Sequence, residues 1–168
     1  MTISTIALLI FPLLMAFAAA SDLLTMRISN RLVLLLVAAF LPVALFAGLP
    51  LQQLAMHAAF AGLVLVVAFA FFAFGWIGGG DAKFAAATAL WLGNEVLLPY
   101  LVYAGLLGGA LTFAVLLLRR VPLTPQIAGA AWLARLHDSK AGVPYGIALA
   151  AAGLAVYTQA DIYVRIAA

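Results

Sequence analysis

Long unbroken apolar runs are the feature that most constrains what this chain can fold into. Residues 3–20, 32–49 and 54–77 are each about as long as the roughly 20 residues that a helix needs to cross a bilayer. Membrane β-barrels are instead built from short segments of alternating polarity. The runs therefore predict an all-α, polytopic integral membrane protein.

The rest of the chain contains more apolar segments of the same kind. Residues 84–118 form a run that is too long for one spanning helix, and the turn-forming sequence Gly93-Asn94-Glu95 divides it. We expect about six transmembrane helices in a single membrane-embedded domain, residues 1–168. The expected spans cover residues 3–20, 32–49, 54–77, 84–93, 96–118 and 143–160.

The composition indicates that the apolar segments are in contact with a lipid bilayer. Hydrophobic residues make up 68% of the chain and charged residues only 8%, compared with roughly 25% charged in soluble domains. The net charge is +3, but the basic residues are scattered at segment ends, which argues against nucleic acid as a partner. The absence of cysteine excludes disulfides and thiolate chemistry.

The basic residues predict an orientation. With six spans, the loops 22–31, 78–83 and 119–142 lie on one side of the membrane and hold seven of the eight Lys and Arg residues. By the positive-inside rule that side is the cytoplasm. We expect one short interfacial helix, around residues 127–136, in the third loop.

The N-terminal segment has an alternative interpretation as a cleaved signal peptide, since Ala18-Ala19-Ala20 resembles a small-residue cleavage site. However, the first 20 residues contain no Lys or Arg, and cleavage would place the basic loops on the wrong side. We therefore expect this segment to be retained as the first helix.

Asp22 and Asp81 are the candidates for chemistry. A carboxylate in the middle of a bilayer costs about 2.5 to 3.5 kcal/mol, so each acid of so apolar a chain calls for a reason. The predicted topology brings Asp22 and Asp81 to the same boundary. Glu95 and Asp138 are interpreted as solvated loop charges, and Asp161 lies beyond the sixth span on the opposite face. The alternative for Asp22 is an ordinary helix end paired with Arg27.

Two neighbouring carboxylates favour a definite kind of chemistry. They do not both ionise easily, so the pair tends to share one proton. The ionised member then takes a proton from an attacking water, and the protonated member polarises a peptide carbonyl. This is the chemistry of aspartic proteases, and the sequence leaves open which aspartate is protonated.

Three glycines, Gly78, Gly79 and Gly80, precede Asp81 directly. Glycine has no side chain to obstruct a substrate and tolerates positive φ, so the string fits a place where backbone approaches a ligand closely. The alternative is an ordinary flexible loop.

Three patches of the sequence resemble the prepilin leader peptidases, which are bacterial membrane aspartic proteases with a Gly-x-Gly-Asp motif. Residues 22–30 resemble the first aspartate of that family and its Ile-Pro-Asn element, with Ser29 where proline is usual and Asn30 as the asparagine. Residues 78–83 resemble the second aspartate's motif, including the lysine, Lys83. Residues 143–148 resemble the closing Pro-Tyr-Gly element.

The resemblance implies a function. A member of this family cleaves the short basic leader of a type IV pilin precursor on the cytoplasmic side of the bacterial inner (plasma) membrane, while the substrate's hydrophobic segment lies in the bilayer. The chain looks like the short type that serves Flp or tight-adherence pili. Larger relatives that also methylate the product carry a domain with cysteine pairs, so we do not predict methyltransferase activity.

The resemblance also implies further residues that shape the site. These are Asn30, Gly78, Gly79, Gly80, Lys83, Pro144, Tyr145 and Gly146, in addition to the catalytic pair. Lys83 either stabilises an ionised aspartate or marks the cytoplasmic edge of the membrane, and the sequence does not decide between these roles.

Other function classes fit the sequence less well. A proton- or ion-coupled transporter that uses Asp22 and Asp81 is the alternative, but no inverted repeat is evident. A structural subunit of a secretion apparatus would tolerate the loss of either aspartate. His57 and His137 are isolated and no His-Glu-x-x-His pattern occurs, so we predict no metal and no cofactor. The oligomeric state is left open.

Overall fold

The protein folds into a bundle of α-helices. The computed structural model describes residues 2–122 and 129–168, and within these residues it contains helices and no strands. The helices are α1 (Ile3–Thr25), α2 (Asn30–Phe46), α3 (Leu51–Ala73), α4 (Gly79–Leu92), α5 (Leu97–Leu118), α7 (Ala131–His137), α8 (Gly146–Tyr157) and α9 (Asp161–Ala167). The predicted all-α, polytopic membrane fold is confirmed.

The predicted number of about six spans is not confirmed. Among the described residues, three helices are long and apolar enough to cross a membrane, namely α1, α3 and α5 with 23, 23 and 22 residues. A fourth span is obtained if α8 and α9, which are bent by 47° relative to each other, are counted together. The helix α2 is apolar but has only 17 residues.

The short helices α4 and α8 each pack against several other helices of the bundle. The helix α4 contacts α2, α3, α8 and α9, and α8 contacts α1, α4 and α5. Nine of the 14 residues of α4 are buried, but only three of the 23 residues of α3. A helix end at membrane depth is tolerated when protein surrounds it, so α4 and α8 need not span the bilayer.

Small side chains allow α4 and α8 to pack closely. The helix α8 is mostly alanine and glycine, and small residues of this kind let neighbouring helix backbones approach each other in membrane proteins. At Gly153 a Cβ atom would lie 3.0 Å from the Thr88 side chain of α4 and 3.4 Å from Phe11 of α1. Gly153 therefore marks the point where these three helices meet.

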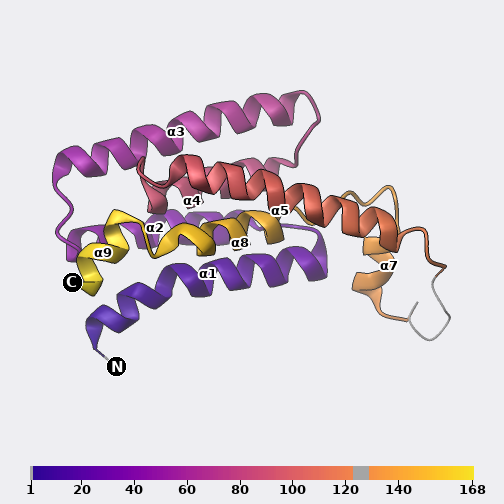
Figure 1. The fold of residues 1–168 in the computed structure, drawn as a ribbon, viewed down its shortest axis with the longest axis horizontal. Helices are drawn as coiled ribbons and strands as arrows, with labels where there is room; N and C mark the ends of the chain where they lie inside the picture. Colours follow the sequence, from indigo (N-terminus) through magenta and orange to yellow (C-terminus); the bar gives the residue numbers. More distant parts are fainter. Residues whose placement is uncertain (1, 123–128) are drawn as a thin grey trace.

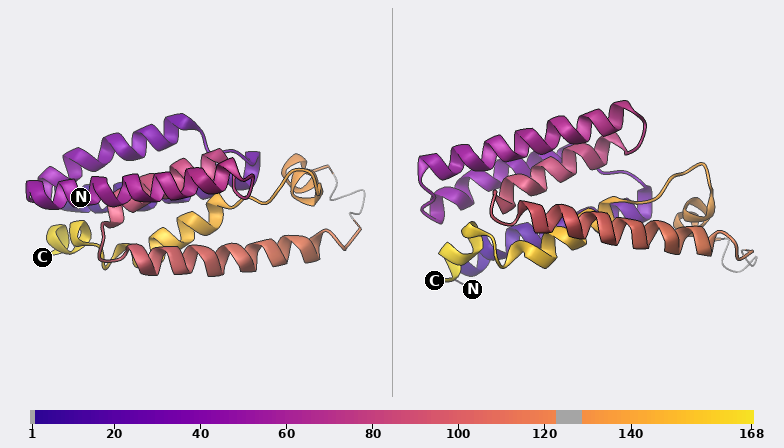
Figure 2. Two further views of the ribbon diagram at one scale, coloured as in Figure 1. Left: turned by 90° about the horizontal axis from the view of Figure 1, so that it is seen from above. Right: turned by 45° about the horizontal axis from the view of Figure 1, so that its top comes forward.

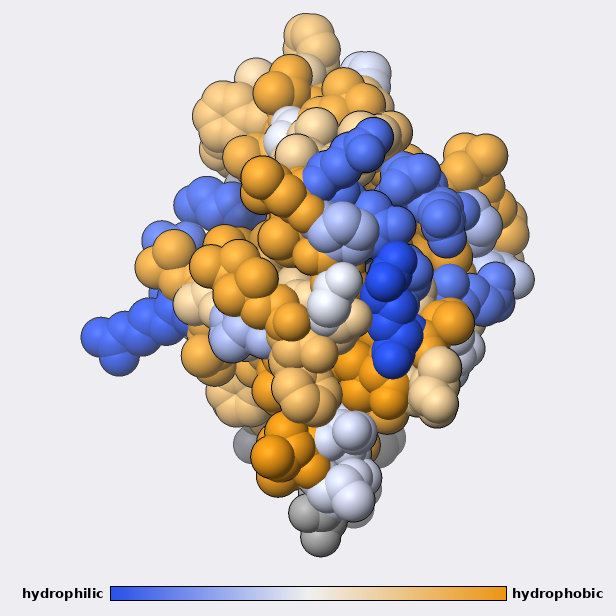
Figure 3. Space-filling model, turned by 90° about the vertical axis from the view of Figure 1, so that its left-hand side faces the viewer, coloured by the Kyte–Doolittle hydropathy of each residue, from blue (hydrophilic) through white to orange (hydrophobic). Residues whose placement is uncertain are grey.

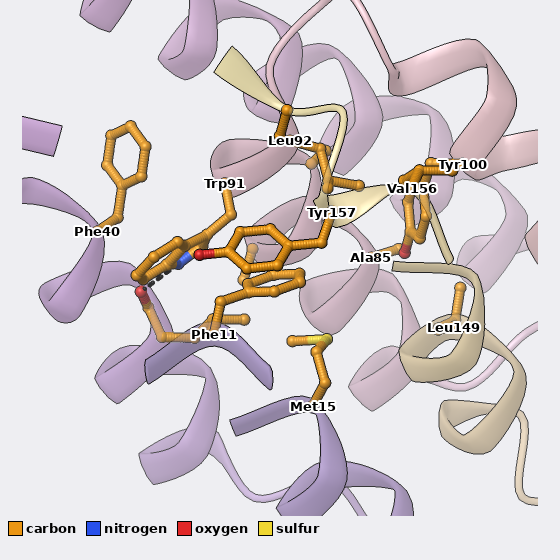
Figure 4. Packing of buried hydrophobic residues seen from close by; sticks show 14 of the residues in the cluster. Phe11, Met15, Phe40, Ala85, Trp91, Leu92, Tyr100, Leu149, Val156 and Tyr157 are labelled. Carbon is orange, nitrogen blue, oxygen red and sulfur yellow. Dashed lines mark hydrogen bonds between the residues drawn. The ribbon is translucent and has the colours of Figure 1, made fainter. Parts of the chain in front are cut away.

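Aromatic side chains fill the core (Figure 4). The ring of Phe11 stacks on Tyr157 with centroids 4.5 Å apart and lies 5.4 Å from Trp91. The indole nitrogen of Trp91 donates a hydrogen bond of 2.9 Å to the Leu36 carbonyl, drawn as a dashed line in Figure 4. A buried indole N–H without an acceptor would be costly, so this bond fixes α4 against α2.

Both termini lie at one end of the bundle, on the left in Figure 1. Seen from that end, hydrophilic residues form a band across the middle of the view, with hydrophobic residues above and below it (Figure 3). Arg165 forms an ion pair of 2.8 Å with Asp161 and donates a bond of 3.1 Å to Gln53, which links α9 to α3.

The opposite end gathers the segments that the sequence predicted on one side of the membrane. The end of α1, the start of α2, the turn from α3 to α4 and the start of α8 lie together at the right of Figure 1, and the views of Figure 2 agree. The arrangement follows from the alternating direction of successive helices.

A short helix, α7, lies beside this end. Arg119 at the end of α5 donates hydrogen bonds to the carbonyls of Leu136, at 2.9 Å, and Gly142. Arg135 of α7 donates to the Leu24 carbonyl in the last turn of α1. The predicted interfacial helix of residues 127–136 thus overlaps α7, which begins at Ala131, whereas residues 127 and 128 lie outside the described residues.

Tyr145 joins the start of α8 to α5. Its hydroxyl donates a hydrogen bond of 3.0 Å to the Ala104 carbonyl, and its ring covers Gly108 so closely that a Cβ atom there would lie 2.1 Å from the ring. Gly109, one residue further along the same helix, has open space at this position.

We expect Gly108→Ala to lower the free energy of unfolding by about 1 to 3 kcal/mol, because the Tyr145 ring must leave its place and lose the bond to Ala104. Gly109→Ala should leave it unchanged. Denaturation of the purified protein in detergent measures both. In a Tyr145→Ala background, Gly108→Ala should have little effect, and an undiminished effect there would contradict this explanation.

Candidate active site

Asp22 lies in the last turn of α1. The helix ends at Met26, whose backbone is left-handed with φ at +54° and whose N–H donates to the Asp22 carbonyl at 2.8 Å. The Asp22 side chain is buried, with 4% of the residue exposed, and Oδ2 accepts a hydrogen bond of 2.7 Å from the Gly146 backbone N–H. The first turn of α8 therefore binds the carboxylate at the end of α1.

Asp81 lies in the first turn of α4. Gly78 is the N-cap of this helix, with φ at −72° and ψ at 144°, and its backbone N–H donates a hydrogen bond to the Asp81 carboxylate. This resembles the reciprocal half of a capping box, in which an acidic side chain in the first turn satisfies the N-cap amide. The local sequence thus turns the carboxylate back toward the loop.

Two glycines make room for the two carboxylates. A Cβ atom at Gly78 would lie 2.7 Å from Oδ2 of Asp81, and a Cβ atom at Gly146 would lie 2.7 Å from Oδ2 of Asp22. Neither Gly78 nor Gly146 has a positive φ, so the backbone conformation would accept a side chain at both positions. It is the lack of space beside the carboxylates that excludes one. Each carboxylate is therefore held against a glycine amide.

Both carboxylates line one cavity of about 980 Å³ at this end of the bundle. Its walls come from the end of α1, the loop between α1 and α2, the loop between α3 and α4, α5, and the segment before α8. The lining residues are Asp22, Met26, Arg27, Ile28, Ser29, Gly75, Trp76, Ile77, Gly78, Gly80, Asp81, Thr112, Ala141, Gly142, Val143 and Tyr145.

The electrostatics of Asp81 reflect burial and a neighbouring charge. Burial and, secondarily, repulsion from the Asp22 carboxylate raise the pKa of Asp81 to about 6, and the hydrogen bond from Gly78 opposes this change only partly. Asp81 lies outside the helices that are long enough to span a membrane. A carboxyl group of this kind holds a proton at a higher pH than an exposed aspartate does.

Lys83 and Asn30 bind each other instead of the aspartates. The Lys83 ammonium donates a hydrogen bond of 3.1 Å to Oδ1 of Asn30, which joins α4 to the first residue of α2. Neither residue lines the cavity. Among the described residues, Lys83 forms no ion pair with an aspartate; the ion pair found there joins Arg165 and Asp161. The structure therefore gives no direct support to the role of Lys83 in stabilising an ionised aspartate.

The other predicted site-shaping residues differ in their distance from the cavity. Tyr145 lines it, as Gly78 and Gly80 do. Pro144 is fully buried and does not line the cavity, and the Gly146 amide donates to Asp22. Gly79 faces away from the carboxylates, since a Cβ atom there would meet the Phe72 ring at 3.2 Å.

Several cavity residues were missed by the sequence interpretation. Trp76 and Thr112 line the cavity although they carried no motif signal that we recognised. Thr112 is a hydroxyl-bearing residue within the apolar run of α5, which is a signal that marks it in retrospect. Ile28 also lines the cavity, and the sequence had given it only as part of the element that resembles Ile-Pro-Asn, with no role of its own.

The described residues contain no group of three or more His, Cys, Asp or Glu side chains arranged to hold a metal ion. His57 is buried near the opposite end, where its Nδ1 lies 2.7 Å from the Leu90 carbonyl.

Comparison with known proteins identifies one family. Residues 9–113, more than half of the chain, match the profile of the type IV leader peptidase family. The matched region runs from α1 into α5 and includes Asp22 and Asp81, but not the segment before α8. No curated protein and no solved structure matches the chain.

We expect the Asp81 carboxyl to titrate near pH 6 instead of near 3.8. Asp22→Asn removes the repelling charge, so the midpoint should fall, while staying above 3.8 because burial is the larger cause. Infrared spectroscopy of the membrane-reconstituted protein between about pH 4 and 8 follows the protonated carboxyl band. Asp81→Asn is the control that removes this band, and a midpoint unchanged by Asp22→Asn would contradict the interaction.

Proposed function

We propose, since the chain belongs to the type IV leader peptidase family, that it is an aspartic endopeptidase that removes the leader of a type IV prepilin at the cytoplasmic face of the membrane. The family membership and the apolar helices establish a membrane-embedded leader peptidase. The catalytic type, the residues that carry it and the side of cleavage are our proposal.

One observation carries the proposal: two carboxylates from helices far apart in the sequence, Asp22 buried and Asp81 partly buried, share a cavity. Asp22 and Asp81 line the same space and interact electrostatically. A chain with five acidic residues has few ways to provide a carboxylate pair. The pair supports hydrolysis by general acid and base catalysis, with no need for a nucleophilic side chain.

The proposed reaction uses one shared proton. The ionised carboxylate accepts a proton from a water molecule as its oxygen attacks the carbonyl carbon of the scissile peptide bond. The protonated carboxyl donates its hydrogen to the carbonyl oxygen in the tetrahedral intermediate. As the C–N bond breaks, the carboxyl that took the proton from water gives it to the leaving nitrogen. A hydroxyl of the intermediate becomes the carbonyl of the product and returns its proton to the other carboxylate, so the pair again holds one proton. The apparent pKa values then belong to the pair as a unit.

The distribution of charge supports a cytoplasmic site. Seven of the eight basic residues belong to the three segments that gather at the end with the cavity. Positively charged segments of this kind remain on the cytoplasmic side. We place the protein in the bacterial inner membrane, with Flp or tight-adherence prepilins as substrates and without N-methylation of the product.

The test is leader removal. When the chain is produced together with a candidate prepilin, Asp22→Asn and Asp81→Asn should each lower the processing rate by about 10² to 10⁴-fold, because each removes one partner of the acid and base pair. The mobility of the prepilin on a gel measures processing. Asp138→Asn is the matched control, since Asp138 is an exposed aspartate whose side chain, among the described residues, accepts a hydrogen bond from the Lys140 backbone N–H.

Processing at the normal rate by either Asn variant at position 22 or 81 would refute the paired-aspartate mechanism. If the unaltered chain failed to cleave every candidate prepilin, a proton- or ion-coupled transporter would become the better explanation for the pair.

The two glycines that face the carboxylates provide a second prediction. Gly78→Ala and Gly146→Ala should each reduce processing as strongly as loss of an aspartate, because the new Cβ atom would occupy the place of a carboxylate oxygen. Gly79→Ala, in the same loop, meets only the outer edge of the Phe72 ring at 3.2 Å and should retain most activity. Equal losses at positions 78 and 79 would show that general loop stiffness, not space for Asp81, explains the glycines.

A further inference from the structure

The segment of residues 26–30 between α1 and α2, here called the bridging segment, lies between the two carboxylate-bearing motifs. It starts at the left-handed Met26 and ends at Asn30, the first residue of α2. Met26, Arg27, Ile28 and Ser29 all line the cavity. The segment therefore forms the wall that connects the Asp22 side to the Asp81 side.

Ile28 touches both motifs. A Cβ atom built at Gly80 would lie 3.5 Å from Cβ of Ile28 and 3.6 Å from its carbonyl oxygen. A Cβ atom built at Gly146 would lie 2.6 Å from Cδ1 of Ile28. The Ile28 side chain thus packs between the glycine that precedes Asp81 and the glycine whose amide binds Asp22.

Hydrogen bonds hold the bridging segment at both ends. On the α1 side, the hydroxyl of Ser21 donates to the Arg27 carbonyl at 3.2 Å. The hydroxyl of Thr25 donates to the Ser21 carbonyl at 2.7 Å and lies 3.2 Å from the Arg27 carbonyl. On the α4 side, Lys83 donates to the Asn30 side chain at 3.1 Å. Lys83 follows Asp81 by two residues in the first turns of α4, so this bond connects the bridging segment to the helix that carries Asp81.

We propose that the bridging segment fixes the separation of the two carboxylates, with Ile28 as the contact between the motifs and the bond from Lys83 to Asn30 as its anchor. This inference rests on the proposed function. Lys83 is then a positioning residue that acts through Asn30, and its positive charge is not required to be near Asp81.

The separation matters because a carboxylate pair works only within a narrow range of distances. The Coulomb energy between the two groups varies inversely with their distance, so loosening the motifs weakens the coupling that keeps one proton on the pair. A displacement of about 1 Å at a catalytic group also costs up to about 10²-fold in rate. Loss of the anchor should therefore lower kcat more than it changes KM.

The experiment compares Lys83→Met, Asn30→Ala and the double variant on a prepilin fusion that carries a short basic leader and a hydrophobic helix. Each single variant should lower kcat by about tenfold to a hundredfold with KM nearly unchanged, and the double variant should be no worse than either. Lys140→Met is the matched control, because Lys140 is an exposed lysine at the same end and its side chain is not part of the anchor.

The pH profile of kcat/KM separates positioning from a general loss of folded protein. The titratable side chains that line the cavity are Asp22, Arg27, Asp81 and Tyr145. The width of the bell-shaped profile is the separation of the two apparent pKa values of the pair. Both single variants should reduce this separation equally, because more distant carboxylates repel each other less. If Lys83→Met moved the profile and Asn30→Ala did not, the lysine would act on Asp81 through its charge, and the inference would be wrong.

A chemical cross-link between positions 30 and 83 provides a further test of the anchor. The chain has no cysteine, so N30C/K83C introduces the only two thiols. A short bis-maleimide that joins them should restore kcat, while either single cysteine variant treated in the same way should stay impaired. If the cross-link forms and kcat is not restored, the proposed anchor between Lys83 and Asn30 is wrong.

A failure of the proposed function gives a different result. If the unaltered chain does not cleave the prepilin fusion, the proposed function fails, and the inference is then decided by infrared titration alone. In that case Lys83→Met and Asn30→Ala should each lower the titration midpoint of Asp81, as weaker repulsion requires. An unchanged midpoint in both variants would overturn the inference.

Discussion

The protein has to keep two carboxylates near each other at the end of a bundle whose outer surface is apolar. Carboxylates do not tolerate hydrocarbon, and two of them repel each other when both are ionised. The structure meets both demands by placing Asp22, which is buried, and Asp81, which is partly buried, among protein atoms and giving each a backbone amide as a hydrogen-bond donor. The short, small-residue helices α4 and α8 are at the centre of the bundle for the same reason, since they carry those contacts.

Backbone amides suit this environment. An amide supplies a hydrogen without adding a charge that would itself need a partner in a low-dielectric surrounding. The Gly146 amide belongs to the first turn of a helix, where the N–H groups have no intrahelical acceptor. The bond to Asp22 satisfies such an amide and connects residues 124 positions apart. One interaction thus serves the stability of α8 and the position of a carboxylate.

The sequence predicted the fold class and the end of the bundle at which Asp22 and Asp81 lie. Both predictions depend on local hydrophobicity and on the alternation of helix direction, which a single sequence displays. The number of spanning helices was not predictable in the same way. Whether α4, with its 14 residues, faces lipid or protein depends on its neighbours in space, and Ala-rich segments look equally apolar in either setting.

The finer features of the site depend on contacts between distant segments. Gly146 was predicted as site-shaping through a resemblance, but nothing in the sequence says that its amide points at Asp22. The hydrogen bond between Lys83 and Asn30 was not predicted either, because the position of Lys83 two residues after Asp81 suggested an ion pair with that aspartate. Ile28 belonged to the element that resembles Ile-Pro-Asn, but its role was not predicted, because its contacts with Gly80 and Gly146 join segments far apart in the sequence.

The length of α5 has a consequence for the supply of water. Thr112 lines the cavity, and α5 continues for six more residues to Leu118, which adds about 9 Å of helix beyond the cavity. In Figure 1, α5 extends beyond the neighbouring helices at this end of the bundle, and Arg119 at its end is bonded to α7. If the two carboxylates hydrolyse a peptide bond as proposed, a water molecule that approaches the cavity from this end passes the last turns of α5 first.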